Sequence, residues 1–145
     1  MADEKRSKKA VRAALVAIDG ATSGRPLALA LSQAMAAEEK LGPAERKAAA
    51  RAARGVLREL RRIDAALAFA GEAAGIKLKR FEPHDRTLLR YLALRVFVEG
   101  EAPARPLAEL ALPGPRRPRA IDDRMLAQLA AQLPSPDALP LPDDA

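Results

Sequence analysis

The stretch ERKAAARAARGVLRELRRIDAAL, residues 45–67, decides the fold. Basic residues recur in it at intervals of three and four, which is the spacing of one face of an α-helix. At 100° per residue, the members of this row all lie within about 60° of Lys47. The row consists of Lys47, Arg51, Arg54, Arg58, Arg61 and Arg62. The segment therefore predicts a helix with one basic face.

Small and apolar residues occupy the opposite face of this predicted helix. They are Ala49, Ala53, Val56, Leu60, Ile63 and Leu67. Gly55 is unusual here, because glycine inside a helix costs about 0.5–1 kcal/mol relative to alanine. We hypothesise that a neighbouring helix or loop crosses closely at Gly55. Two interpretations of the basic face stay open: a solvated surface whose arginine stems cover apolar groups, or a surface that binds a polyanion.

The same periodicity predicts helices along most of the chain, and strand signals are nearly absent. The expected helices cover approximately residues 3–19, 26–40, 43–62, 63–70, 83–98, 107–112 and 121–133, with the fourth a possible continuation of the third. We expect glycines 20, 71 and 100 to end three of them. Prolines exclude a helix over residues 113–119. We therefore expect an all-α chain, with a compact bundle of about six to seven helices over residues 1–133 and an extended tail or linker over residues 134–145.

The residue types that catalysis and metal binding need are sparse. The chain has no cysteine and one histidine, His84, which follows a proline at a predicted helix start and reads as a surface or capping residue. The loop GATSG, residues 20–24, lacks the lysine of a phosphate-binding loop. We expect no catalytic residue, no metal site and no cofactor. The absence of cysteine, of a signal peptide and of a long apolar run predicts a cytoplasmic protein without a membrane partner.

Positive charge concentrates at the start of the chain. Residues 1–62 hold 14 lysines and arginines against 7 acids, whereas the last 13 residues hold 3 acids and no base. A second basic group precedes the row described above and consists of Lys5, Arg6, Lys8, Lys9 and Arg12. It predicts a basic N-terminal arm that becomes ordered on RNA, with a frayed solubilising terminus as the alternative. A GC-rich genome, in which arginine and alanine are abundant, is an alternative source of the overall excess.

Three segments resemble the NusB-like RNA-binding fold, and more narrowly the N-terminal domain of bacterial ribosomal RNA 5-methylcytosine methyltransferases of the Sun/Fmu/RsmB type. They are PLALALSQAM at 26–35, the stretch at 45–67 with its Gly-Val-Leu-Arg element, and LLRYLALRVFVEGEAP at 88–103. The resemblance covers about residues 10–133. It implies an all-helical bundle that binds structured RNA without catalysis, while the methyltransferase chemistry belongs to a separate, later domain.

The resemblance leaves two functions open. The first is a non-catalytic RNA-binding module, with ribosomal RNA as the expected partner and a methyltransferase domain as a further one. The second is a NusB-type transcription antitermination factor that pairs with a ribosomal protein. For the first function we expect the contacts to come from two groups of basic residues. The groups are Lys5, Arg6, Lys8, Lys9 and Arg12, and Lys47, Arg51, Arg54 and Arg58.

Overall fold

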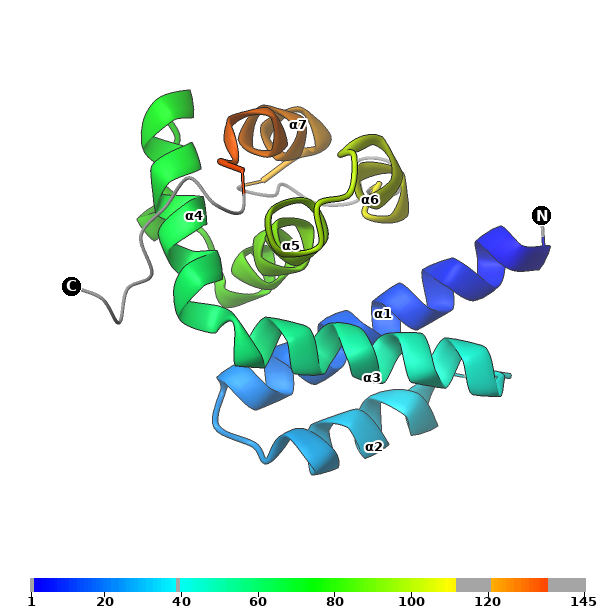
Figure 1. Cartoon of the computed structure of the whole chain (residues 1–145). Coiled ribbons are helices and arrows are strands. Elements are labelled where there is room, and N and C mark those ends of the chain that lie inside the picture. Colours follow the sequence, from blue (N-terminus) through cyan, green and yellow to red (C-terminus); the bar gives the residue numbers. More distant parts are fainter. Residues whose placement is uncertain (1, 39, 112–120, 136–145) are drawn as a thin grey trace. The chain divides into compact units, whose positions relative to one another are not determined.

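The computed structural model describes residues 2–38, 40–111 and 121–135, with only the backbone given for residues 2–7. Every regular element in these ranges is helical, and none is a strand (Figure 1). Seven α-helices, one 3₁₀ helix and one π-helical turn follow one another. The predicted all-α class is therefore confirmed. The proline-containing segments at 113–119 and 136–145 lie outside the described residues.

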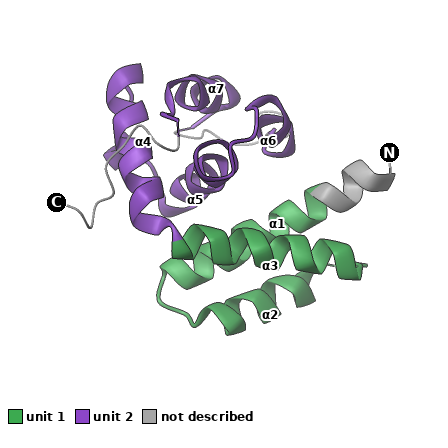
Figure 2. Ribbon diagram, in the orientation of Figure 1, with its two compact units in different colours: residues 1–58 green, residues 59–145 purple. Residues whose placement is uncertain are grey.

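The chain divides into two compact units, residues 1–58 and residues 59–145 (Figure 2). The boundary lies inside the stretch 45–67, where the periodicity suggested a helix as far as Arg61 or Arg62. That helix instead ends at Arg58, and Glu59, with φ −103° and ψ 19°, caps the next helix, which begins at Leu60. A domain can contain more than one such unit, so the single domain expected over residues 1–133 stays a prediction.

Unit 1 consists of three helices, α1 (Ala2–Thr22), α2 (Leu27–Ala37) and α3 (Pro43–Arg58). Helices α1 and α3 run in the same direction, and α2, which connects them in the sequence, runs in the opposite direction (Figure 1). All three pairs of helices are in contact. The buried positions are mostly alanines, which allow close approach of helix backbones. They include Ala13, Ala14 and Ala17 of α1, Ala30 and Ala34 of α2, and Ala49 and Ala53 of α3.

Gly20 lies at one such close approach, between α1 and α2. A Cβ atom added at Gly20 would lie 3.1 Å from the Cβ of Ala30 in α2. We predicted that Gly20 ends the first helix, but the helix continues to Thr22 because this glycine is needed for packing and not for a turn. The end is made by Thr22 and Ser23, whose hydroxyls donate to the carbonyls of Ile18 and Asp19 at 2.8 and 2.7 Å. Gly24 then adopts a φ of 110°.

Unit 2 is built around α4 (Leu60–Ala74), which contacts both α5 (Pro83–Ala93) and α7 (Asp123–Gln132). The 3₁₀ helix η1 (Leu78–Arg80) joins α4 to α5, and α6 (Ala104–Glu109) contacts α7. Helix α5 continues into a π-helical turn, η2 (Leu94–Val98), so helical structure reaches Val98 as predicted. Large apolar side chains with at most 1% exposure form the core of this unit, among them Ile63, Leu89, Leu92, Phe97, Ile121, Leu126 and Leu129.

The predicted end of α4 was wrong. Gly71 was expected to end the helix, yet it lies buried inside it, and the end falls at Gly75, which has a φ of 72°. A Cβ at Gly71 would lie 3.0 Å from the carbonyl oxygen of Ile76. The following segment therefore folds back against Gly71, and local helix signals could not show this. The short helix expected at residues 107–112 also begins earlier, at Ala104.

Candidate nucleic-acid interface

The basic face of α3 is the candidate interface in unit 1. Lys47, Arg51, Arg54 and Arg58 are all exposed, while Ala49, Ala53 and Val56 on the other side are buried. We call these four cations the α3 row. Eleven residues separate its ends, which is about 16 Å along a helix axis. Gly55 is also buried, and the close crossing hypothesised there stays a prediction.

None of the four side chains of the α3 row has an ion-pair or hydrogen-bond partner in the described part of the chain. Many other arginines of the protein do have acidic partners. Arg12 pairs with Glu38, Arg62 with Glu59, Arg90 with Asp64, and Arg95 with Glu99, Glu101 and Glu109. Helix α3 itself contains a single acid, Glu45, in its first turn. The row is therefore a line of cations whose charge is not neutralised locally.

The predicted continuation of this row through Arg61 and Arg62 was wrong, because both residues belong to α4 in unit 2. The guanidinium of Arg62 donates to Glu59 at 3.2 Å and lies 5.3 Å from the centre of the Phe97 ring. Its charge is thus already engaged within unit 2. The periodicity was continuous across the helix break, so sequence alone could not separate these two arginines from the other four.

The basic group at the start of α1 is less uniform. Lys5 and Arg6 lie in the helix, where the structure gives only their backbone. Lys8 is exposed, and Lys9 is partly exposed and has an interaction partner. Arg12 donates from Nε to Glu38 Oε1 at 2.8 Å and from Nη2 to Oε2 at 3.4 Å. This hydrogen bond raises the pKa of the Arg12 guanidinium above its ordinary value. Arg12 thus serves first as a link between α1 and α2.

The formal charges divide unequally between the two units. Residues 1–58 hold 12 lysines and arginines against 6 acids, whereas residues 59–145 hold 13 against 13. The entire net charge of +6 is therefore that of unit 1. Because both basic groups lie in this unit, a polyanion in solution is attracted to unit 1 first.

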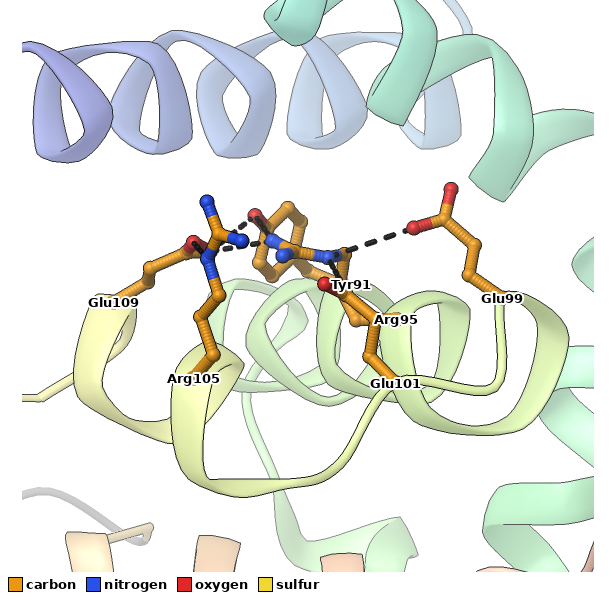
Figure 3. A network of polar contacts seen from close by, with 6 residues as sticks. All are labelled: Tyr91, Arg95, Glu99, Glu101, Arg105 and Glu109. Carbon is orange, nitrogen blue, oxygen red and sulfur yellow. Dashed lines mark hydrogen bonds and ion pairs between the residues drawn. The ribbon is translucent and has the colours of Figure 1, made fainter.

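A second cluster of polar side chains lies in unit 2 around Arg95 (Figure 3). The Tyr91 hydroxyl donates to Glu109 Oε1 at 2.9 Å, and the Arg95 guanidinium donates to Tyr91, Glu101 and Glu109. Burial, reinforced by Glu109, raises the pKa of Tyr91, and the hydrogen bond from Arg95 lowers the pKa of Glu101. Burial opposes the charge of Arg95, but these partners outweigh it and raise its pKa. The polar groups of this cluster form hydrogen bonds with one another. We therefore assign the cluster a role in holding unit 2 together.

Other kinds of site find little support among the described residues. His84 is exposed at the first turn of α5 and has an interaction partner. No three histidine or acidic side chains in the described ranges come together as a possible metal site. None of the helices described is both long and apolar enough to cross a bilayer.

Comparisons of the chain with protein-family models, with curated proteins and with solved structures find no match.

Proposed function

We propose that this protein is a non-catalytic RNA-binding module, with structured ribosomal RNA as its ligand. The observation that carries the proposal is the α3 row, in which four exposed cations have no partner of their own in the described ranges. Its length of about 16 Å lets it reach several phosphates of one strand, since the charges of duplex DNA, for comparison, follow one another at roughly 3.4 Å along each strand. The sequence resemblance to NusB-like domains supports RNA as the polyanion.

The mode of binding follows from the side chains available. Of the four aromatic residues, Phe81, Tyr91 and Phe97 are buried, and only Phe69 is exposed, at 50%. Single-strand binders usually stack bases on several exposed aromatic rings. Here the contacts are expected to go to phosphates, with counterion release as the main contribution to affinity.

A salt titration with two charge-matched variants tests the proposal. The row variant carries Arg51→Gln, Arg54→Gln and Arg58→Gln. The control variant carries Lys77→Gln, Arg80→Gln and Arg124→Gln, which are likewise exposed and have no partner among the described residues. Both changes lower the net charge from +6 to +3. The row variant is expected to lower the slope of log affinity against log salt by about 2–3, because each phosphate that the row no longer neutralises removes roughly 0.7 from the slope for a single strand and roughly 0.9 for a duplex.

The outcome for the control decides between the row and the overall charge. If both variants lower the slope equally, RNA binding depends on the net charge of the molecule, and the α3 row is not its specific contact. If the unmodified chain binds no ribosomal RNA fragment at low salt but captures a ribosomal protein stoichiometrically, the NusB-type antitermination function replaces the one proposed here.

A further inference from the structure

A pocket of about 220 Å³ lies within unit 2, between α4, η1 and α5. Three leucines line its apolar part: Leu67 of α4, Leu78 of η1 and Leu89 of α5. Leu67 and Leu89 are 4% and 1% exposed, so they belong to the core of the unit and give the pocket a fixed floor. Charged side chains from the same three elements complete the lining.

The charges around this floor do not cancel. Arg90 donates to Asp64 through two parallel hydrogen bonds, Nε to Oδ1 at 3.0 Å and Nη2 to Oδ2 at 3.1 Å. The one acid in the lining is thus neutralised by one of the three cations. Lys79 and Arg86 remain, both exposed and neither with a partner in the described part of the chain. The pocket therefore combines an apolar floor with two positive charges that are free to bind an anion.

Packing holds the wall that carries Lys79. The amide of Ile76 donates to the carbonyl of Gly71 at 2.8 Å, and the amide of Phe81 donates to Leu78 at 3.1 Å. A Cβ added at Gly71 would lie 3.1 Å from Cγ of Leu78, so η1 sits directly against α4. The backbone at Lys79 is consequently held in place before any ligand arrives, so only the side chain of Lys79 has to be ordered on binding.

We propose that this pocket binds one nucleotide of an RNA strand, with a phosphate between Lys79 and Arg86 and the sugar and base against the leucines. The volume favours this class of ligand. Pockets for complete small ligands are commonly about 300–1,000 Å³, so this smaller one suits a single unit of a longer chain. The choice of RNA as the ligand rests on the proposed function. The pocket would give unit 2, whose net charge is zero, its own contact with the RNA.

The first test measures binding of the full chain to a single-stranded RNA oligonucleotide. The pocket variant carries Lys79→Gln and Arg86→Gln, and the control carries Lys77→Gln and Arg80→Gln, which lie nearby and do not line the pocket. Because the pocket variant loses one phosphate contact, we expect its affinity to be about fivefold weaker at 0.1 M salt. We also expect its slope of log affinity against log salt to be smaller by about 0.7. The control is expected to stay within about twofold, because Lys77 and Arg80 do not line the pocket and would neutralise no phosphate bound there.

The second test separates this proposal from the proposed function. Nucleoside monophosphate and inorganic phosphate are titrated separately into the full chain, and backbone and arginine side-chain NMR signals are followed. Shifts at Lys79, Arg86 and Leu78 with the nucleotide support the pocket even if the chain binds no RNA, which would refute the proposed function alone. RNA binding with equal affinities for pocket variant and control overturns the pocket. Identical shifts with phosphate alone overturn the role given to the leucines.

Discussion

Arg95 joins three parts of unit 2, because its guanidinium contacts Tyr91 in α5, Glu101 after η2 and Glu109 in α6. The side chains of Arg95 and Glu109 are only 13% and 12% exposed. Removing one partner of a largely buried pair leaves the other charge without compensation. We expect Arg95→Ala to lower the free energy of unfolding by about 2–3 kcal/mol, measured by urea denaturation.

Arg12→Ala is the matched control for this prediction. The pair of Arg12 with Glu38 has similar geometry, but 59% of the Arg12 side chain is exposed. Exposed pairs are worth about 0–1 kcal/mol, so Arg12→Ala is expected to stay within that range. Equal losses of stability for the two variants would show that burial does not govern the strength of these pairs.

Glu101 gives the same cluster a dependence on pH. The hydrogen bond from Arg95 lowers the pKa of Glu101 below its ordinary value near 4.5. Its contribution to stability is therefore complete above that ordinary value and is lost as the pH falls through the lower pKa of the folded state. In urea denaturation at several pH values, the stability difference between the unmodified chain and Glu101→Gln should shrink as the pH falls below about 4.5. A constant difference across this range would contradict the prediction.

At the scale of elements, the helices were predictable and several of their ends were not. The 3.6-residue period of Lys47, Arg51, Arg54 and Arg58 is a local property, so it correctly located the exposed face of α3. The ends depend on contacts between segments. Gly20 continues its helix because Ala30 approaches it, and Gly71 does so because Ile76 and Leu78 fold against it.

The same reasoning explains what the sequence left out of the candidate sites. Arg12 and Glu38 are 26 residues apart, and so are Asp64 and Arg90. Neither pair can be read from a helical period. In the first pair, Glu38 neutralises Arg12, which belongs to the basic group expected to contact RNA. In the second pair, Arg90 neutralises Asp64, so Lys79 and Arg86 are the pocket charges without a partner in the described ranges. The sequence shows Lys79 within a basic run at residues 77–80, but it does not show that Arg86 and the three leucines lie beside it.

Gly71 inside α4 and Gly75 at the C-terminal cap of α4 should respond differently to the same two substitutions. Gly75 has a φ of 72° and open space around it, so Gly75→Ala should cost about 1–2 kcal/mol through backbone conformation. Gly75→Asn should cost less, since asparagine tolerates this conformation better. At Gly71 the obstacle is the backbone oxygen of Ile76, so Gly71→Asn should be at least as harmful as Gly71→Ala. Thermal unfolding of the four variants measures this, and a recovery by asparagine at Gly71 would contradict it.

At the scale of the whole molecule, the distribution of charge explains how a polyanion is attracted but provides no means of distinguishing one base from another. Unit 1 carries the net charge of +6 and unit 2 carries none, so the long-range attraction of a polyanion belongs to unit 1. Neither the α3 row nor the proposed pocket contains an aromatic ring or an amide side chain that would distinguish one base from another. Affinity should therefore follow the number of phosphates reached.

This argument predicts weak preference among bases together with strong dependence on salt. Four phosphate contacts by the α3 row correspond to a salt slope of about 2.8, so affinity for single-stranded RNA should fall about 50-fold between 50 and 200 mM salt. At matched length and salt, poly(U), poly(A) and poly(C) should bind within about threefold of one another, because phosphate contacts carry no sequence information. Fluorescence anisotropy of labelled oligomers measures both quantities. A preference above about tenfold for one homopolymer would require a base contact worth about 1.4 kcal/mol, which the exposed side chains of the row do not provide.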